Sequence, residues 1–543
     1  MIEQSIWRPI SRNEWLMVVA STVSASAVAC LWSWNHHAML NYGDAVAHLH
    51  IARRVFDSHR PGLSQLGSVW LPLPHLLMLP FVTVYAWWAN GIAGLIPSAL
   101  AYIAGCAGIY RLARHWLRIP AALVALLFFA LNPNLLYLQT TAMTEPLFLC
   151  EMIWLSVWLV EWRAALNKDL PLAARRLFLI SLVLVAAVFT RYDGWVLAFL
   201  AWTSIGIVQL RHSTLRSRTF WLCSAAVIAA PLVWFGYNAI VFNDWLDFAR
   251  GPYSAAAIEL RTSTPGSGPP HPGWHNPWVS VLFFIKCAEM DAAFEAWGNL
   301  MLALAALGTA WAWLTTRHRA FNWTLFLWLP VPFYAYSISY GSVPIFLPVW
   351  WPHSWYNTRY GMEMLPAFAL GFAFVAQFVI AATREFKPAL VRYTAAVLYG
   401  IVVLNAWHVL RDHPLTYVEG VKNIESRRQL EAEIPPVLRS LLATHPGGLV
   451  LMNTSVYPNL VAFTGIPLRQ TLNEGDREYL SAALTAPAAQ ASIVVAFDGD
   501  EIAAAVKKHP EGLRAIARFN APGQPAGTVY VSDTPPGSKA PER

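Results

Sequence analysis

Runs of about 20 residues with almost no charge recur along this chain, and they constrain its fold more than any other feature. The clearest runs are residues 15–34, 219–241 and 361–382. As a helix, each run is long enough to cross a hydrocarbon core about 30 Å thick. Only 13% of the 543 residues are charged, whereas a soluble domain carries about 25% charged residues. Lipid must therefore be part of the solvent, and we expect a polytopic membrane protein.

The apolar runs predict an all-α bundle of about 11 transmembrane helices. They lie near residues 15–34, 92–110, 119–137, 144–162, 177–190, 194–210, 219–241, 296–314, 323–340, 361–382 and 390–409. Six basic segments flank these runs, and a cytoplasmic N-terminus places all six in the cytoplasm, as the positive-inside rule requires. Topology thereby explains the net charge of +7, so no nucleic-acid partner is expected. We predict a multi-pass protein of the inner (plasma) membrane.

With this sidedness, the loops 35–91 and 242–295 and the region after residue 410 are expected outside the cytoplasm. The apolar stretch 71–89 would be a twelfth span, but counting it would reverse the side of every later basic loop. Its three prolines instead favour a broken helix at the interface or a re-entrant element. A further interruption, at residues 190–194, predicts a tight hairpin between two apolar halves that are short for full spans.

Beyond residue 410 the composition becomes that of a soluble protein. Residues 448–453, 492–497 and 528–531 are predicted to be buried strands, and residues 476–486 and 500–507 helices. We therefore expect a transmembrane domain over residues 1–410 and a small extracytoplasmic α/β domain over residues 411–532, which is a common domain size. Residues 533–543 are expected to be disordered.

Charged residues at the membrane boundary are the candidates for function, because each costs roughly 2.5–3.5 kcal/mol at the centre of a span. Asp44 follows the first span, and helical spacing places it one turn from His48 on the same face. A carboxylate beside an imidazole can act as a general base. The alternative is that Asp44 caps an interfacial helix while Arg53 and Arg54 bind lipid phosphates. Spacing alone leaves both interpretations open.

Two further charged groups lie at the predicted outer ends of spans. Glu145 opens a span, where the helix dipole favours an anion by about 0.3–1 kcal/mol, so it is either a capping residue or a catalytic carboxylate. Arg191 and Asp193 lie in the predicted hairpin, where the arginine pairs either with Asp193 or with a substrate phosphate.

The segment from His353 to Glu363 precedes a late span and combines aromatic residues with a cation and a carboxylate. An aromatic belt at the interface explains the tryptophans. The forked guanidinium of an arginine suits a phosphate, so Arg359 is a candidate phosphate ligand, with Tyr360 beside it. A salt bridge between Arg359 and Glu363 is the alternative.

In the order of four local elements, residues 15–410 resemble the GT-C superfamily, in particular bacterial relatives of protein O-mannosyltransferases and the lipid A aminoarabinose transferases. The elements are Gly43-Asp44 after the first span, Trp70 to His75 followed by Ile96 to Leu100, Met143 to Pro146, and Arg359-Tyr360 before a late span. The resemblance implies a GT-C-like membrane bundle, and a soluble C-terminal domain outside the membrane fits it.

The resemblance also implies an activity, that of an inverting glycosyltransferase. A sugar would pass from a polyprenyl-phosphate donor to an extracytoplasmic acceptor, which could be a lipid, a glycan or a protein. Asp44 would activate the acceptor hydroxyl, while Arg359 and Arg191 would stabilise the departing phosphate. Glu145 and His48 would contact the acceptor or orient Asp44. His75 would help to seat the interfacial segment.

The expected partners are the lipid-linked sugar donor and membrane lipids, and no cofactor is expected. Many relatives have an Asp-Glu pair at the first motif, whereas this chain has Asp44-Ala45, which leaves one carboxylate there and puts the binding of a divalent metal in doubt. The five cysteines share no metal-ligand spacing. The rival function is that of a polytopic transporter or lipid flippase, but the chain shows no internal repeat between its halves and no central charged relay. A purely structural scaffold would leave the charged motifs unexplained.

Overall fold

The computed structural model describes residues 9–166, 168–212, 217–262, 269–316 and 319–533. The chain divides into two compact units. The first comprises residues 1–35, 68–74 and 97–419, and the second comprises residues 36–67, 75–96 and 420–543.

Helices make up the first unit. They are α1 (Arg12–Asn35), α5 (Ile92–Arg114), α6 (Ile119–Ala130), α7 (Pro133–Leu138), α8 (Glu145–Ala165), α9 (Leu170–Thr190), α10 (Asp193–Arg211), α11 (Arg218–Phe242), α12 (Asp247–Arg250), α13 (Ala255–Thr262), α14 (Pro277–Ala292), α15 (Glu295–Thr315), η3 (Arg319–Trp328), α16 (Pro330–Tyr340), η4 (Thr358–Met364), α17 (Leu365–Phe386), η5 (Pro388–Leu390) and α18 (Val391–Arg411). Eight helices of the described chain are long and apolar enough to cross a membrane. The predicted multi-pass membrane bundle is therefore confirmed.

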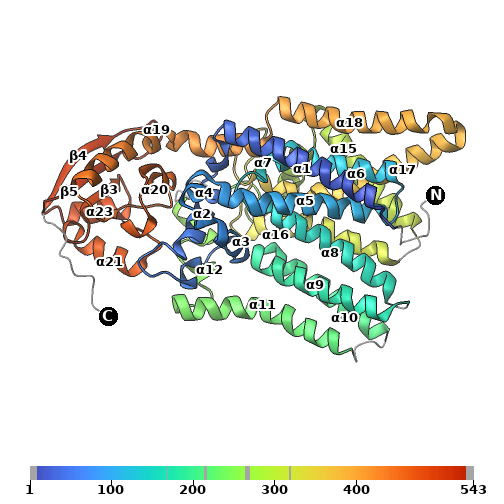
Figure 1. Ribbon diagram of the computed structural model, residues 1–543, viewed down its shortest axis with the longest axis horizontal. Helices are drawn as coiled ribbons and strands as arrows, with labels where there is room; N and C mark the ends of the chain where they lie inside the picture. Colours follow the sequence, from blue (N-terminus) through green and yellow to red (C-terminus); the bar gives the residue numbers. More distant parts are fainter. Residues whose placement is uncertain (1–8, 167, 213–216, 263–268, 317–318, 534–543) are drawn as a thin grey trace. The chain divides into compact units, whose positions relative to one another are not determined.

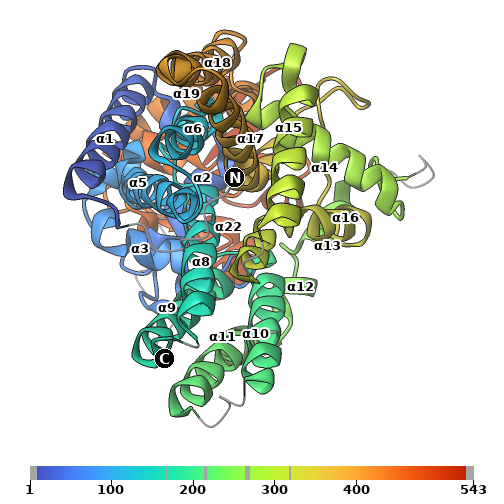
Figure 2. The same cartoon turned by 90° about the vertical axis from the view of Figure 1, so that its right-hand side faces the viewer.

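The long helices of this unit run roughly in one direction (Figure 1) and are seen along the bundle in Figure 2. In both views α9, α10 and α11 lie together at one edge and α18 lies at the opposite edge, packed against α6 and α17. Helices α15 and α17 approach closely because each has a glycine at the crossing. A Cβ atom at Gly308 or Gly371 would collide with the backbone of the other helix.

The predicted spans fall on these helices, with informative differences at two places. The predicted run 119–137 forms two short helices, because Pro133 interrupts it and Asn132 caps α7 by accepting a hydrogen bond from the Leu135 N–H at 3.1 Å. The hairpin at residues 190–194 is confirmed, but its halves are not short. Helix α9 begins at Leu170, where Asp169 caps it, and has 21 residues.

The stretch 71–89 forms no continuous helix. It contains α3 (Leu73–Val82) and α4 (Tyr85–Asn90), and Gly91 follows with a φ of +91°. Helix α3 has 10 residues, which is about 15 Å of helix and half of a hydrocarbon core. The predicted broken helix is confirmed, although Pro80 lies inside α3 and the break comes after Val82.

A partly buried helix that the sequence analysis missed lies inside the predicted loop 242–295. Helix α14 has 16 residues and packs against α16 and η4. Its apolar run is interrupted by Lys286, Glu289 and Asp291, so hydropathy did not mark it. Lys286 and Glu289 form an ion pair at 2.9 Å, which lowers the cost of burying both charges.

The second unit contains a five-stranded sheet in the order β2-β1-β3-β5-β4. Its strands are β1 (Val450–Leu451), β2 (Thr471–Leu472), β3 (Ile493–Phe497), β4 (Leu513–Phe519) and β5 (Gly527–Ser532). Strands β1, β2 and β3 are parallel, whereas β5 is antiparallel to both β3 and β4. The remaining helical elements of the unit are η1 (Ala38–Leu40), α2 (Gly43–Arg54), η2 (Leu63–Leu66), α19 (Leu415–Thr444, from Gly420 onward), α20 (Asn459–Thr464), η6 (Leu468–Gln470), α21 (Arg477–Thr485), α22 (Pro487–Gln490) and α23 (Glu501–Lys508).

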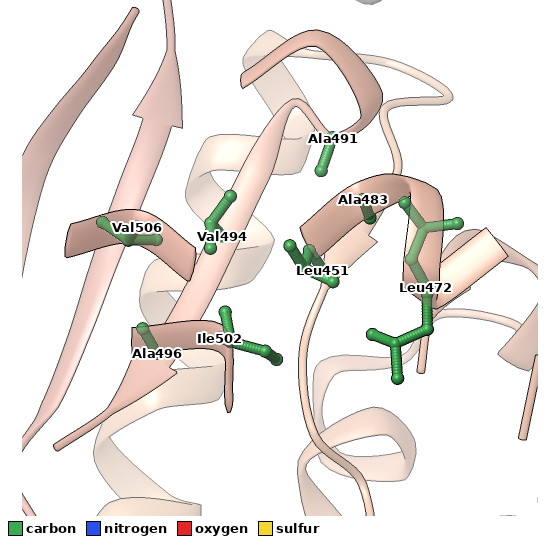
Figure 3. Close-up of a cluster of buried hydrophobic side chains, with 9 residues drawn as sticks. Leu451, Leu472, Ala483, Ala491, Val494, Ala496, Ile502 and Val506 are labelled. Carbon is green, nitrogen blue, oxygen red and sulfur yellow. The ribbon is translucent and has the colours of Figure 1, made fainter. Parts of the chain in front are cut away.

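Aliphatic side chains from the sheet and its helices form the core of this unit. Figure 3 shows Val494 and Ala496 of β3 beside Ile502 and Val506 of α23, with Leu451 and other residues completing the cluster. The expected strands at 448–453, 492–497 and 528–531 and the helices at 476–486 and 500–507 are confirmed, while α19, β2 and β4 were not foreseen. Residues 534–543 of the expected disordered tail lie outside the described residues.

This unit also includes residues 36–67 and 75–96 from the N-terminal part of the chain. Composition alone pointed to a C-terminal domain beginning at residue 411. The difference arises because α2 packs with η6 and α4 packs with α20, elements more than 300 residues away. The side chain of Asp57, for example, accepts hydrogen bonds from the backbone N–H groups of Leu468 and Arg469 at 3.2 and 3.3 Å.

Candidate functional site

The residues singled out from the sequence fall into two groups, one in each unit. The first unit holds Glu145, Arg191, Asp193, Arg359, Tyr360 and Glu363, and the second holds Asp44, His48, Arg53, Arg54 and His75. Each group is described by itself below.

Glu145 lies at the centre of the group in the first unit. It opens α8, as its position after Thr144 predicts, and only 1% of its surface is exposed. Its Oε1 atom accepts hydrogen bonds from Arg191 Nη1 at 3.2 Å and from Arg359 Nε at 3.1 Å. One carboxylate therefore joins two arginines that are 168 positions apart in the sequence.

Arg191 lies between α9 and α10 and is surrounded by acceptors. Its Nε atom donates to Asp193 Oδ2 at 3.0 Å, so the predicted internal pair is present. Its Nη2 atom donates to the Tyr334 hydroxyl at 2.9 Å and lies 3.0 Å from Glu363 Oε1. The hairpin geometry thus places this guanidinium among three carboxylates.

Arg359 lies in η4 and has a second carboxylate partner, Glu419 of α19. Arg359 Nη1 donates to Glu419 Oε1 at 2.9 Å. The same carboxylate accepts hydrogen bonds from the backbone N–H groups of Asn357 and Thr358, both at 2.9 Å. Glu419 therefore fixes the backbone on which Arg359 stands, which limits the directions in which the guanidinium can point.

The ring of Tyr360 packs against both arginines. The guanidinium carbon of Arg191 is 5.0 Å from the ring centroid and that of Arg359 is 5.1 Å from it. Both distances are within the range of cation–π attraction. Tyr360 and Arg191 are partly exposed, whereas Arg359, Glu145 and Glu363 are buried. The cluster therefore reaches the surface of the unit at Tyr360 and Arg191.

Acids outnumber arginines in this cluster. The carboxylates of Glu145, Asp193, Glu363 and Glu419 face two guanidiniums. Sequence reasoning missed Glu419 and Tyr334. Glu419 follows the last span in a polar region where a glutamate suggests a solvated surface, and Tyr334 lies in an aromatic run of α16. A buried tyrosine whose hydroxyl donates to Glu363 at 2.7 Å has no local sequence pattern.

In the second unit, Asp44 lies in the first turn of α2, one turn before His48, as the spacing predicts. Asp44 is partly exposed, whereas His48 is buried. A carboxylate at this position is favoured by the dipole of the helix. It also remains accessible to a substrate.

His48 and His75 form a buried pair. His48 Nδ1 lies 2.7 Å from His75 Nε2, so one ring nitrogen donates to the other. Burial keeps the pKa of His75 well below its usual value, and the charges of His48 and Arg54 lower it further. Burial also lowers the pKa of His50 to about 3. His75 and His50 are therefore neutral at physiological pH. The hydrogen bond between His48 and His75 joins α2 to α3.

Arg53 and Arg54 contact the unit's own structure. Arg53 Nε pairs with Asp57 Oδ2 at 3.0 Å, and its Nη1 atom donates to the carbonyls of Val82 and Thr83 at 2.6 and 3.1 Å. Arg53 therefore links α2 to the end of α3. The guanidinium of Arg54 packs against Gly475, where any Cβ atom would collide with it.

Within the described residues, no three His, Cys, Asp or Glu side chains are arranged to hold a metal ion. No family model matches the chain, and no curated protein matches it in sequence.

Solved structures, in contrast, resemble it along nearly its whole length. ArnT from Cupriavidus metallidurans bound to undecaprenyl phosphate has a TM-score of 0.54 and 14% identity over 96% of this chain and 98% of that chain. The apo state of ArnT from the same organism has a TM-score of 0.51 and 13% identity, over 94% of this chain and 98% of that chain. An oligosaccharyltransferase from Archaeoglobus fulgidus, in complex with Zn and sulfate, has a TM-score of 0.46 and 10% identity, over 94% of this chain and 72% of that chain. This TM-score is too low to support an argument. At these identities the likeness to ArnT concerns the fold, and it confirms the expected GT-C-like architecture.

Proposed function

We propose that the chain is a membrane glycosyltransferase that moves a sugar from a polyprenyl-phosphate donor to a hydroxyl acceptor outside the cytoplasm. The observation that carries the proposal is the pair of guanidiniums that both contact the ring of Tyr360, in a chain with the fold of ArnT. ArnT was crystallised with undecaprenyl phosphate. That fold-level likeness supports a lipid phosphate as the anion that the arginines recognise.

Arg191 and Arg359 are the proposed ligands of the donor phosphate. Both guanidiniums already form ion pairs with carboxylates, so a phosphate must replace at least one of these pairs. Glu145 is the contact whose loss is best tolerated, because Arg191 would retain Asp193 and Glu363 while Arg359 would retain Glu419. Glu145 thus holds the two guanidiniums in place until the phosphate binds.

Asp44 is the proposed general base. It is partly exposed, whereas Glu145 is buried and bound to two arginines. In the reaction, the proton of the acceptor hydroxyl passes to the Asp44 carboxylate as the acceptor oxygen bonds to the anomeric carbon. The bond between that carbon and the phosphate oxygen breaks, and its electron pair leaves with the phosphate. Attack opposite the leaving group inverts the anomeric centre.

The test is transfer from a sugar-charged polyprenyl phosphate by the purified protein, followed by release of polyprenyl phosphate. Asp44→Asn keeps the shape of the side chain but cannot accept a proton, so the rate should fall by about 10²- to 10⁴-fold. Arg359→Lys should be milder, because lysine keeps the charge and loses the forked geometry. We expect a raised KM for the donor with some turnover left.

A matched control is Asp498→Asn. Asp498 is an exposed carboxylate of the same unit whose ion pair with Arg518 lies at the surface, so its loss should leave transfer unchanged. Wild-type transfer by a folded Asp44→Asn protein would rule out the proposed base and make Glu145 the next carboxylate to test. A transporter or flippase would move the lipid across a vesicle without releasing polyprenyl phosphate, and that result would refute the proposed function.

A further inference from the structure

The N-terminus of α2, which carries Asp44, is capped by a residue from the C-terminal part of the chain. The first backbone N–H groups of a helix have no partner within it, and the side chain of Tyr42, at the N-cap of α2, makes no capping hydrogen bond. The N–H of Gly43 instead donates to Asn423 Oδ1 at 3.0 Å. Asn423 lies in α19, 380 positions further along the chain.

A buried arginine fixes this cap. Arg427 follows Asn423 by one helical turn, and its Nη2 atom donates to the same Asn423 Oδ1 at 3.0 Å. Its Nε atom donates to the Asn423 carbonyl at 3.1 Å. Its Nη1 atom donates to the Val456 carbonyl, after β1, at 3.4 Å. The guanidinium is therefore fixed in position by both α19 and the segment that follows β1.

The absence of a side chain at Gly43 lets these groups approach the helix. A Cβ atom at Gly43 would lie 3.3 Å from both Arg427 Nη1 and Asn423 Oδ1. The next residue of α2 is Asp44. Glu431 Oε1 lies 3.8 Å from Arg427 Nη1 and partly compensates the charge of the guanidinium. Gly43 at the start of α2 is thus in contact with both Asn423 and Arg427 of α19.

We propose that Asn423 and Arg427 are positioning residues for Asp44, an inference that rests on the proposed role of Asp44 as the base. Asn423 holds the first turn of α2, which sets the direction of the Asp44 side chain. Arg427 holds Asn423 by two hydrogen bonds and so keeps the cap in place. The base and the residues that orient it therefore come from segments about 380 positions apart in the chain.

The split between kcat and KM tests Arg427. In Arg427→Gln the shorter side chain cannot bond Asn423 and the Val456 carbonyl together. We expect a lower kcat, while the KM for the donor stays near its wild-type value because Arg191 and Arg359 are the proposed phosphate ligands. The matched control is Arg428→Gln, because Arg428 is exposed and has the same charge. Equal changes of kcat in Arg427→Gln and Arg428→Gln, or no change in either, would overturn the role of Arg427.

Hydrogen–deuterium exchange tests Asn423 without measuring transfer. Asn423→Ala should speed exchange of the amides in residues 43–47 and lower kcat without moving the pH profile. Ser426→Ala, at an exposed position of the same helix, should do neither. Wild-type exchange and kcat in Asn423→Ala would overturn the positioning role. If Asp44→Asn itself transfers sugar normally, the proposed base is wrong, whereas an inactive Asp44→Asn beside a normal Arg427→Gln refutes only the positioning inference.

Discussion

Helix α8 carries a buried glutamate near each of its ends, and the two ends differ in their balance of charge. Glu161, near the C-terminal end, pairs with Arg111 at 2.5 Å, with Arg176 at 2.6 Å and, through Oε1, with His115 at 3.4 Å. Glu145, at the N-terminal end, shares two arginines with three other carboxylates. Basic groups outnumber acids at the first end, and acids outnumber arginines at the second.

The difference separates two uses of a buried ion pair. At the Glu161 end a single carboxylate compensates its cations, so the pair is needed for the fold. At the Glu145 end each arginine has an alternative carboxylate, so one contact can be exchanged for a ligand. The helix dipole favours both arrangements, because it attracts anions at the N-terminal end and cations at the C-terminal end. By our predicted topology, the cation-rich end faces the cytoplasm.

The largest effect on stability is expected from Glu161→Gln. Removing the carboxylate leaves the partly buried Arg111 and Arg176 without this counter-charge. Breaking a fully buried pair costs about 3–5 kcal/mol, which sets the upper bound of the expected loss. Thermal unfolding in detergent should show a strongly lowered midpoint. Glu425→Gln is the control, because Glu425 is exposed and its pair with Lys422 lies at the surface. Equal midpoints for the two variants would contradict the structural role of Glu161.

The sequence predicted the residues of the Glu145 end better than their partners. Thr144-Glu145-Pro146 marks a helix start and Arg191 interrupts an apolar run, so local pattern identified both. Glu419 could not be found in this way, because its pairing with Arg359 spans 60 positions and depends on where α18 returns the chain. The same reason hid Asn423. Local pattern predicts which side chains are costly to bury, but pairing between distant segments follows from packing.

A smaller effect on stability is expected from Glu145→Gln. Because the two arginines keep Asp193, Glu363 and Glu419, the free energy of unfolding should fall by roughly 1 kcal/mol, far less than in Glu161→Gln. If Glu145 competes with the donor phosphate, the KM for the donor should stay the same or fall while kcat changes little. A loss of kcat by about 10²-fold or more would instead make Glu145 the catalytic acid or base.

Local sequence pattern was limited in the same way for the fold, because it could not show contacts between distant segments. Hydropathy placed the helices of the bundle, because a run of 20 apolar residues needs no partner to be recognised. It missed α14, whose charges are compensated only in the folded chain by the contact between Lys286 and Glu289. It also could not show that residues 36–67 and 75–96 belong with the C-terminal sheet, since that association depends on contacts such as those of Asp57.

The smallest effect is expected at the third glutamate of α8. Glu151 lies between the other two and is buried, and its Oε1 atom accepts a hydrogen bond from the Thr190 hydroxyl at 2.8 Å. An ionised carboxylate inside a span without a paired cation is costly, so we expect Glu151 to be neutral. Glutamine has nearly the same shape and can accept the same hydrogen bond. Glu151→Gln should therefore change the unfolding free energy by less than about 0.5 kcal/mol.

Comparing the thermal unfolding midpoints of Glu151→Gln and Glu151→Ala separates the effect of losing the side chain's shape from the effect of losing its charge. Alanine removes the hydrogen bond and leaves a cavity, so it should lower the midpoint although it removes no ion pair. If Glu151→Gln instead lost as much stability as Glu161→Gln, Glu151 would be ionised and paired. The contrast between the two ends of α8 would then be wrong, because the charge of the helix would be compensated along its whole length.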